Sequence, residues 1–357
     1  MNSASSADQG LRIAFVACNK NPDRFGEDPS FIYRCENLGA GLRTLGAEVW
    51  LGHIARFPWQ RRFDWVVFHR PKASWRFYFL HAWLRSRGIG MSADFDDLVF
   101  DPAFACFSPG VLNGQVEFAA TIKNFALHRD ALAMFSAVTV STTPLADLVA
   151  SSFGNASVHV LPNAIHWSWH SKPEFDRLSS DGRPVIGYFP GTRSHDRDFA
   201  QIADLLGRVL NRHPEAILSV TGPLAFNVAA RSDQILHHEK LCFSRFHERF
   251  AGISVNLAPL ETTPFTRCKS ALKVLEGAFW NIPTICSELP DAERLIGAGA
   301  SQASNCNEFE DCLERFLTEP DFLISTRAGL RKKILQKANI YLLADEWLDW
   351  VKARHAI

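Results

Sequence analysis

Short runs of apolar residues alternate along this chain with longer stretches in which apolar positions recur at helical spacing. A buried strand reads as a short apolar run, whereas a helix that covers a sheet repeats its apolar positions about every 3.6 residues. In the first half, the short runs predict strands at residues 11–17, 48–51, 65–68, 88–93, 137–141 and 158–161. The helical stretches between them are residues 31–44, 76–87, 115–135 and 143–151.

The same alternation starts again at residue 185, after a stretch rich in Asn, Pro, Ser, Gly and Asp that shows little periodicity. It predicts strands at residues 185–188, 216–221, 253–257 and 284–287, and helices at 198–212, 244–250 and 266–280. From residue 291 to the end, the pattern predicts mostly helices.

Strands that alternate with helices form parallel sheets covered on both faces, so we expect an α/β fold with two Rossmann-like, doubly wound domains facing a cleft. The chain has 357 residues, 47% of them hydrophobic, which suits two domains of about 150–200 residues each. We assign an N-terminal domain, a linker, a C-terminal domain and a final helix that packs near the domain junction to residues 1–163, 164–183, 184–340 and 341–357.

The charge balance excludes a global basic field, because Lys and Arg together number 38 and so do Asp and Glu. We therefore expect no nucleic-acid partner. The first ten residues lack the pattern of a secretory signal, and no apolar run is long enough to span a membrane. The eight cysteines are scattered without a C-x-x-C pair, which predicts reduced, mostly buried thiols. We expect a cytoplasmic protein, with contact at the inner face of the membrane left open.

The stretch 255–287 is the richest in candidate chemistry. On the helix expected from residue 266, Lys269, Lys273 and Glu276 are spaced i, i+4 and i+7 and so share one face, and Ser270 lies in the first turn. A helix N-terminus flanked by two lysines can bind a diphosphate. Glu276, two turns deeper, could accept hydrogen bonds from ribose hydroxyls. The alternative is a solvated Lys/Glu face.

This stretch resembles the donor-binding helix of retaining GT-B glycosyltransferases of the family-four group, in which E-x7-E precedes G-x-P-V-I. Glu276 matches the second glutamate and residues 281–285 (N-I-P-T-I) match the following turn and strand, whereas Cys268 stands at the first glutamate. The form F-x-x-x-K-S-x-x-K-x-x-E is similar to a variant subgroup of bacterial surface-polysaccharide transferases. The resemblance implies a GT-B fold and a retaining transfer from a nucleotide-diphosphate sugar to a glycan or lipid-linked acceptor. It implies no cofactor and no metal.

Residues 186–199 resemble the first strand and glycine-rich turn of the donor domain in the same proteins, where the turn approaches the donor phosphates. Thr192 and Arg197 occupy the positions of the usual Arg and Lys, so Arg193 or Arg197 would neutralise the phosphates. Asp198 either belongs to the donor site or caps the next helix. The residues of this stretch expected to bind the donor are Gly191, Thr192, Arg193, His195 and Arg197.

In the N-terminal domain, Asp94, Asp96 and Asp97 follow a predicted strand, at the end where α/β sheets bind ligands. Neighbouring apolar residues could raise the pKa of one of these carboxyl groups. We therefore expect acid–base assistance or acceptor binding from this group; the alternatives are a helix cap or a solvated loop. His69 ends the preceding strand of the same sheet, so we expect it to point toward the same cleft as these acidic residues. It is either catalytic or the partner of a carboxylate in a structural pair.

Two arginines are candidates for acceptor binding. Arg34 lies near the start of a helix, where its charge opposes the macrodipole, so an anionic partner is expected. Arg70 follows His69, and the resemblance implies that this position lies near the acceptor. Residues 56–63 and 72–87 interleave basic and aromatic residues, which indicates either rings packed in the core with solvated arginines or contact with anionic headgroups.

Two other functions are compatible with the same patterns. A GT-B nucleotide-sugar epimerase shares the donor site but needs paired acids and no second sugar. A non-catalytic GT-B-like partner would have lost donor binding, which Cys268 makes conceivable.

Overall fold

The computed structural model describes residues 10–19, 21–154, 156–175 and 182–355. The chain divides into two compact units. Unit 1 consists of Met1–Pro102, Ile122–Trp167 and Asn339–Ile357, and unit 2 of Ala103–Thr121 and Ser168–Ala338. The two units differ from contiguous halves of the chain in two places: residues 103–121 belong with unit 2, and the C-terminal helix belongs with unit 1.

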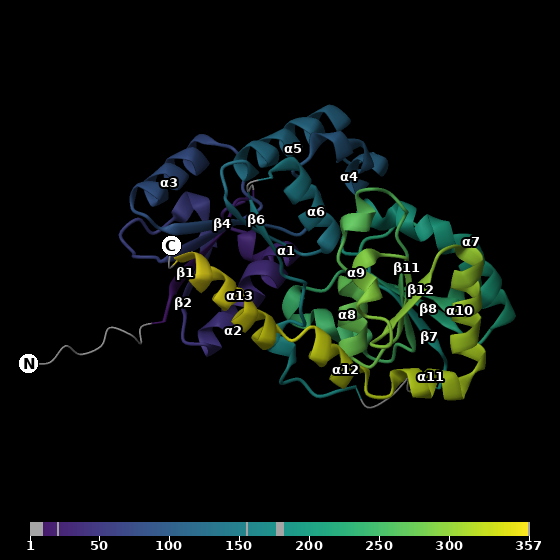
Figure 1. The fold of residues 1–357 in the computed structure, drawn as a ribbon. Coiled ribbons are helices and arrows are strands. Elements are labelled where there is room, and N and C mark those ends of the chain that lie inside the picture. Colours follow the sequence, from purple (N-terminus) through teal and green to yellow (C-terminus); the bar gives the residue numbers. More distant parts are fainter. Residues whose placement is uncertain (1–9, 20, 155, 176–181, 356–357) are drawn as a thin grey trace, which may run out of the picture. The chain divides into compact units, whose positions relative to one another are not determined.

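Unit 1 contains a six-stranded parallel sheet with the order β2-β1-β3-β4-β5-β6 (Figure 1). Its strands are β1 (Arg12–Ala17), β2 (Glu48–His53), β3 (Trp65–His69), β4 (Gly90–Phe95), β5 (Ala137–Val140) and β6 (Ser157–Val160). Its longer helices are α2 (Asn37–Thr44), α3 (Trp75–Ser86), α5 (Phe118–Leu132), α6 (Thr143–Ser152) and α13 (Ile340–His355). The central strands are apolar on both faces, as a sheet covered by crossover helices requires.

The first helical segment of unit 1 is not a uniform α-helix. A short α1 (Pro29–Phe31) leads into a π-helical stretch, Ile32–Glu36, which continues as α2. The Asp28 carboxylate caps the start by accepting a hydrogen bond from the Ser30 amide at 3.0 Å. Arg34 lies within the π-helical stretch, a distortion that is frequent at functional sites.

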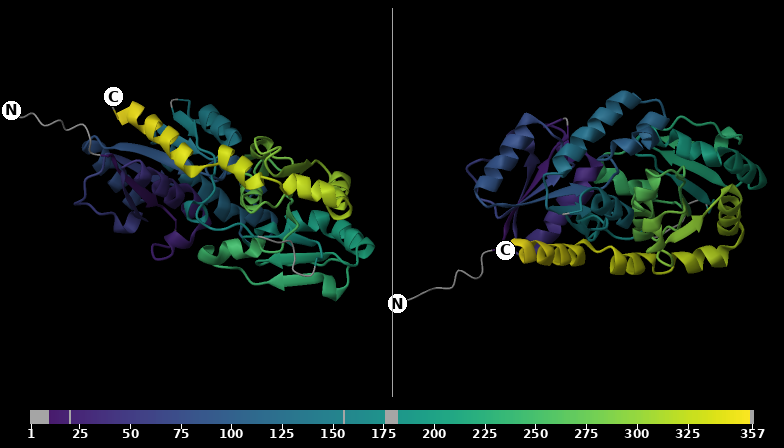
Figure 2. Two further views of the ribbon diagram at one scale, coloured as in Figure 1. Left: turned by 90° about the horizontal axis from the view of Figure 1, so that it is seen from below. Right: turned by 45° about the horizontal axis from the view of Figure 1, so that its top comes forward.

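The C-terminal helix α13 completes the core of unit 1. Its Trp347 and Val351 are fully buried in the same hydrophobic cluster as Leu42 of α2. Figure 2 shows α13 in yellow at the C-terminal end of the chain, and its principal helix contact is with α2. Gly41 permits this close approach, since a Cβ there would lie 2.7 Å from the Cβ of Ala344.

Unit 2 contains a second six-stranded parallel sheet, with the order β12-β11-β10-β7-β8-β9. Its strands are β7 (Val185–Tyr188), β8 (Ile217–Thr221), β9 (Ile235–His238), β10 (Val255–Ala258), β11 (Thr284–Ser287) and β12 (Ala300–Ala303). Its helices are α4 (Pro109–Leu112), α7 (Asp196–Arg212), α8 (Leu272–Phe279), α9 (Pro290–Glu293), α10 (Cys306–Thr318), α11 (Pro320–Arg327) and α12 (Leu330–Lys337).

Two strands and one helix of unit 2 depart from the sequence-based expectation. The edge strands β9 and β12 were not expected, because neither carries the apolar run of a buried strand. The segment Phe243–Phe250 is a 3-10 helix rather than an α-helix. The predicted helix 266–280 is also wrong at its start: a 3-10 turn, Thr266–Cys268, is followed by extended backbone at Lys269, and α8 begins only at Leu272.

All eight cysteines lie among the described residues and all are free thiols. The expectation that most are buried is wrong, since three of the eight, Cys35, Cys268 and Cys286, are buried. Cys18 and Cys312 are partly buried, and Cys106, Cys242 and Cys306 are exposed. In the described part of the chain, no helix is long and apolar enough to cross a membrane.

Gly222, at the turn after β8, is a position where only glycine fits. Its φ is +130°, and a Cβ there would lie 2.2 Å from the Pro190 carbonyl oxygen. We expect Gly222→Ala to lower the free energy of unfolding by about 1–3 kcal/mol, measured by urea denaturation. Gly26→Ala is the matched control, because a Cβ at Gly26 meets no atom within 4 Å and its φ is not positive. Equal stability of the two variants would contradict this account of the turn.

Candidate functional site

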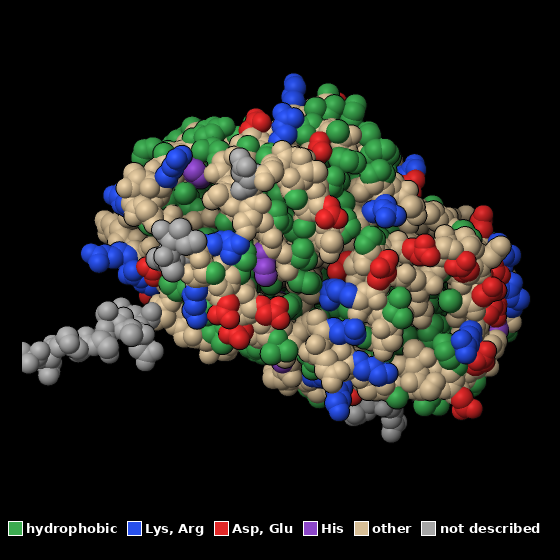
Figure 3. All heavy atoms as spheres, in the orientation of Figure 1, with side chains coloured by type: hydrophobic (Ala, Val, Ile, Leu, Met, Phe, Trp, Pro, Cys, Tyr) green, Lys and Arg blue, Asp and Glu red, His purple; other side chains and the backbone are tan. Residues whose placement is uncertain are grey.

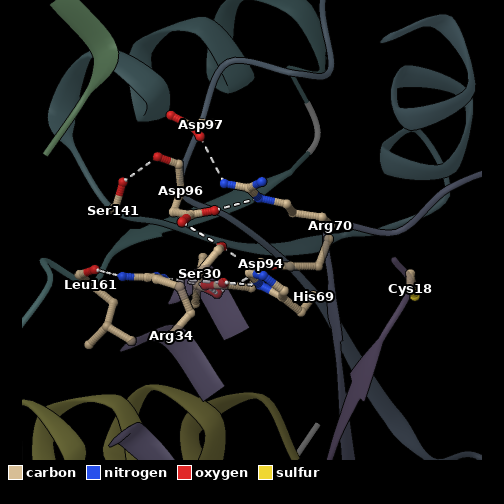
Figure 4. A network of polar contacts seen from close by, with 12 residues as sticks. Cys18, Ser30, Arg34, His69, Arg70, Asp94, Asp96, Asp97, Ser141 and Leu161 are labelled. Atoms are coloured by element: carbon tan, nitrogen blue, oxygen red, sulfur yellow. Dashed lines mark hydrogen bonds and ion pairs between the residues drawn. The ribbon is translucent and has the colours of Figure 1, made fainter. Parts of the chain in front are cut away.

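Polar residues of unit 1 gather where β3 and β4 end. The parallel register pairs His69, the last residue of β3, with Asp94 of β4. Asp96 and Asp97 follow β4 directly. Figure 4 shows these residues together with Ser30, Arg34 and Arg70, a group that we call the carboxylate network. The prediction that His69 and the acidic residues come together at one sheet edge is confirmed.

Arg34 and Asp94 form a buried ion pair at the base of the network. The two residues are 2% and 3% exposed. The Arg34 guanidinium donates through Nη2 to Oδ1 of Asp94 at 2.6 Å and through Nε to Oδ2 at 3.2 Å. It also donates to the Leu161 carbonyl and to Asn163. The anionic partner expected for Arg34 is thus a residue of the same unit. Because Arg34 lies below the surface, it positions Asp94 here and does not present its charge to an acceptor.

The expectation of a raised carboxyl pKa at this site is wrong for Asp94 and Asp96. Burial favours the neutral acid, but the charge of Arg34 and the hydrogen bond from His69 outweigh it and hold the pKa of Asp94 well below its usual range. The charges of Arg70 and His69 likewise overcome burial and lower the pKa of Asp96 to about 2. Both groups are therefore carboxylates at neutral pH. The alternatives of a solvated loop and a helix cap are therefore wrong for Asp94 and Asp96.

Ser30 joins His69 to Asp96, a connection for which the sequence offered no signal beyond a helix start. His69 contacts Asp94 Oδ2 through Nδ1 at 3.1 Å and Ser30 Oγ through Nε2 at 2.9 Å. The Ser30 hydroxyl donates to Asp96 Oδ2 at 2.6 Å. His69 and Ser30 thus link the carboxylates of Asp94 and Asp96 in one continuous chain of polar contacts. The predicted alternative for His69, a structural pair with a carboxylate, is present as one link of a longer chain.

Arg70 holds the outer part of the network. Its backbone is left-handed, with φ of +46°, and its amide donates to the Asp94 carbonyl at 2.8 Å. Its side chain donates to Asp96 at 2.7 Å and to Asp97 at 2.8 Å. Non-glycine residues in this conformation are strained and concentrate at functional sites. Arg70, Asp96 and Asp97 all retain partial exposure, so this face of the network can meet a ligand.

In unit 2, the loop after β7 carries most of the residues predicted to bind the donor. A Cβ on Gly191 would meet no atom within 4 Å, so its backbone is open to close approach. Thr192 Oγ1 lies 2.6 Å from Ser194 Oγ. Arg193 pairs with Asp196 at 3.3 Å, and Arg197 pairs with Glu261 at 2.5 Å. Both arginines remain exposed, and each already has a carboxylate partner within unit 2.

His195, which is partly buried, and the buried Asp198 form a dyad beside this loop. His195 Nδ1 lies 2.8 Å from Asp198 Oδ2, and Asp198 Oδ1 accepts a hydrogen bond from the Glu261 amide at 2.8 Å. Burial, reinforced by the charge of Lys273, lowers the pKa of His195 to about 4. The imidazole is therefore neutral at pH 7, with its proton on Nδ1 and a lone pair on Nε2. The alternative that Asp198 caps the helix is wrong, because α7 begins at Asp196 and the Asp198 side chain is engaged elsewhere.

Lys273 lies in the first turn of α8, and Lys269 and Ser270 precede that helix. The expectation that Lys269 shares a helical face with Lys273 is therefore wrong, although both ammonium groups interact electrostatically with His195. Lys273 is half-buried, and within the described part of the chain no carboxylate lies within ion-pair distance of its Nζ. Burial lowers the pKa of Lys273 to about 8, with Lys269 and Arg249 acting in the same direction against Asp198 and Glu276.

Glu276 is 4% exposed and is paired with a residue that the sequence did not indicate. Arg249 donates to its Oε2 at 2.5 Å, and the guanidinium carbon of Arg249 lies 3.0 Å from the ring centroid of Phe246. The alternative of a solvated Lys/Glu face is therefore wrong for Glu276. Because the two partners are 27 positions apart, no local pattern could have paired them.

Metal ligation receives no support from the side chains that the structure describes. Among them, no group of three or more His, Cys, Asp or Glu residues could hold a metal ion.

No protein-family model matches the sequence, and no curated protein is similar enough to be matched. Solved structures do resemble the fold. Sucrose-phosphate synthase from Thermosynechococcus elongatus aligns with a TM-score of 0.64 at 10% identity, covering 97% of this chain and 99% of that one. HepE from Anabaena, in complex with UDP and glucose, aligns with a TM-score of 0.64 at 11% identity, covering 96% and 99%. An α,α-trehalose-phosphate synthase from Burkholderia xenovorans aligns with a TM-score of 0.56 at 13% identity, covering 83% and 75%. At these identities the likeness is one of fold.

Proposed function

We propose, from the premise that this chain has the GT-B fold of glycosyltransferases, that it transfers a sugar from a nucleotide-diphosphate donor to a glycan or lipid-linked acceptor. In this proposal, unit 2 binds the donor and unit 1 binds the acceptor.

The single observation that carries the proposal is that Lys273 is half-buried and has no ion pair among the described residues. A half-buried ammonium group is costly unless an anion compensates it, and the described residues supply no ion pair. Lys273 lies in the first turn of α8, where the helix dipole also favours an anion. A diphosphate would compensate both. Lys269 and Ser270, directly before the helix, would contact the same group.

The neighbouring residues would orient the rest of the donor. The open backbone at Gly191, followed by Thr192 and Arg193, would approach the phosphates. His195, neutral and held by Asp198, would accept a hydrogen bond from a donor hydroxyl through Nε2. Glu276, held by Arg249, would accept hydrogen bonds from the ribose, as the resemblance implies.

The chemistry of the transfer would rely on electrostatics and positioning. Negative charge develops on the departing diphosphate, and the two lysines would stabilise it as the glycosidic bond breaks. An inverting transfer needs a general base whose pKa lies near the working pH. Asp94 and Asp96 are weak bases, because Arg34 and Arg70 hold their pKa values low. This supports a retaining outcome, in which Arg70 and Asp97 would orient the acceptor.

A ligand screen tests the donor assignment. The melting temperature of the full chain should rise when UDP, GDP or another nucleoside diphosphate binds, because a ligand that binds the native state stabilises it. UDP-glucose is the first donor to try, because HepE has been captured with it. Isomer formation without an acceptor would favour an epimerase. The failure of every nucleoside diphosphate to raise the melting temperature would overturn the proposal.

Donor affinity should depend on pH through Lys273. The group is charged below its pKa of about 8 and neutral above it, and a bound diphosphate favours the charged form. The dissociation constant of UDP should therefore be flat near pH 7 and rise by up to about tenfold for each pH unit above 8. His195 does not titrate there, because its pKa is about 4.

Isothermal titration calorimetry at a series of pH values measures this dependence. Lys273→Arg is the control, because a guanidinium stays charged throughout and should remove the loss of affinity above pH 8. An unchanged pH profile in this variant would assign the titration to another group.

A further inference from the structure

A cluster of aromatic side chains is exposed on unit 1, at α3 and the loop before β3. Trp59, Trp75, Tyr78 and Phe79 are 43%, 72%, 45% and 60% exposed, and we call them the aromatic patch. The three residues on α3 are spaced i, i+3 and i+4, so they share one face of the helix. Figure 3 shows hydrophobic side chains gathered over α3. Contiguous exposed apolar surface of this kind marks an interaction site.

The patch is held in place by ring contacts. Trp59 packs edge-on against Phe79, with ring centroids 5.5 Å apart, and against Trp83, with centroids 5.2 Å apart. Beneath it, Phe57 and Phe77 are buried in the core of unit 1. The interpretation of these segments as rings packed in the core therefore holds for Phe57 and Phe77. The buried rings build the core, and the patch is presented to the surroundings on an ordered surface.

Arginines accompany the patch along α3 and the loop before β3. Arg76 lies over the ring of Trp75 at 4.9 Å, and Arg87 lies over the ring of Trp83 at 3.9 Å. Arg62 and Arg85 are also exposed. Between Trp65 and Ala93 the sequence contains no Asp or Glu.

Ion pairing distinguishes these arginines from several other exposed arginines of the chain. Arg212 and Arg245, for example, pair with glutamates. For the four arginines at the patch, the described residues provide no ion pair. This surface therefore combines apolar rings with positive charges that the described residues do not pair. A partner surface that fits it is apolar and negatively charged.

We propose that unit 1 docks through the aromatic patch onto the surface of a bilayer that contains anionic phospholipids. Trp, Tyr and Phe side chains would enter the headgroup region, where amphipathic rings concentrate in membrane proteins. The surrounding arginines would bind lipid phosphates while their stems cover apolar surface. The proposal is independent of the donor chemistry and concerns a different surface.

Vesicle co-sedimentation of the full chain tests the proposal. We expect binding to phosphatidylcholine vesicles that contain phosphatidylglycerol, weaker binding at high ionic strength, and little binding to phosphatidylcholine alone. The triple variant Trp75→Ser, Tyr78→Ser, Phe79→Ser should lose binding, as should the charge variant Arg76→Glu, Arg87→Glu. The matched control is Ile324→Ser, Leu342→Ser, which removes apolar side chains that are 61% and 57% exposed elsewhere. This control should bind as well as the wild type.

Three results would overturn the proposal. The wild type could sediment equally with and without anionic vesicles, or the control variant could lose as much binding as the triple variant. The wild type could also be a dimer in solution that the triple variant converts to a monomer, which would make this face a self-association interface. Melting temperatures and UDP affinity, measured on the same variants, show whether each one is folded and separate this test from that of the donor site.

Discussion

Lys273→Met is expected to lower kcat/KM for the nucleotide-sugar donor by about 100- to 1,000-fold, equivalent to about 3–4 kcal/mol of transition-state stabilisation. Methionine keeps an unbranched apolar stem of similar length beside Tyr188, whose ring centroid lies 5.5 Å from Nζ of the lysine. The substitution therefore removes the charge with little change in packing. Because the described residues offer no ion pair to this ammonium group, its deletion leaves no carboxylate unpaired.

The measurement is the rate of sugar transfer with the donor found by the ligand screen, together with the dissociation constant of UDP. Lys332→Met serves as the control, because Lys332 is an exposed lysine on α12. Melting temperature reports on folding, and it should stay the same or rise, since a desolvated charge is lost. If the Lys273 variant retained full activity, α8 would not be the diphosphate site.

Asp94→Asn is expected to destabilise unit 1 by about 3–5 kcal/mol, because it leaves Arg34 buried without a compensating charge. Asp94 also accepts hydrogen bonds from Thr139 at 2.8 Å and contacts His69 at 3.1 Å, so several groups lose their partner at once. Replacing both members of the pair, as in Arg34→Met with Asp94→Leu, should lower the free energy of unfolding by less than Asp94→Asn alone. The double variant leaves neither charge stranded in the core.

Urea denaturation followed by tryptophan fluorescence measures these differences. Arg208→Met, which breaks an exposed ion pair with Glu310, is the control and should change stability by at most about 1 kcal/mol. An Asp94→Asn variant as stable as this control would mean that the Arg34–Asp94 pair does not act as a buried ion pair in solution.

The positions of the central strands along the chain could be predicted, because a buried strand appears in the sequence as a short run of apolar residues. Strands β1, β3, β7 and β10 each appear in the sequence as a short apolar run. The edge strand β12 has the sequence Ala-Ser-Gln-Ala and is only partly buried, so its pairing with β11 leaves no trace in hydrophobicity. Edge strands meet one neighbour and less of the core, which weakens the pattern that sequence analysis uses.

For the candidate site, the sequence indicated which residues take part better than it indicated where they lie. His69 and Asp94 were placed together correctly, because the carboxyl ends of adjacent parallel strands meet at one edge. The start of α8 was misplaced, since the spacing of Lys269, Lys273 and Glu276 is equally compatible with a turn that precedes the helix. Helix periodicity cannot mark where a helix begins without a capping residue, and Ala271 provides none.

Element order and the identity of the parallel sheets follow from the amino-acid order, because hydrophobic periodicity and turn residues act over a few positions. The charge states of the site depend on contacts across long stretches of chain. Arg34 reaches Asp94 over 60 positions and Arg249 reaches Glu276 over 27 positions. Burial raises the pKa of a carboxyl group, and the cations that folding brings close to it lower that pKa. The direction of the shift therefore depends on the folded structure. That balance, which reversed the expectation for Asp94 and lowers the pKa of Lys273, exists only once both sheets have formed.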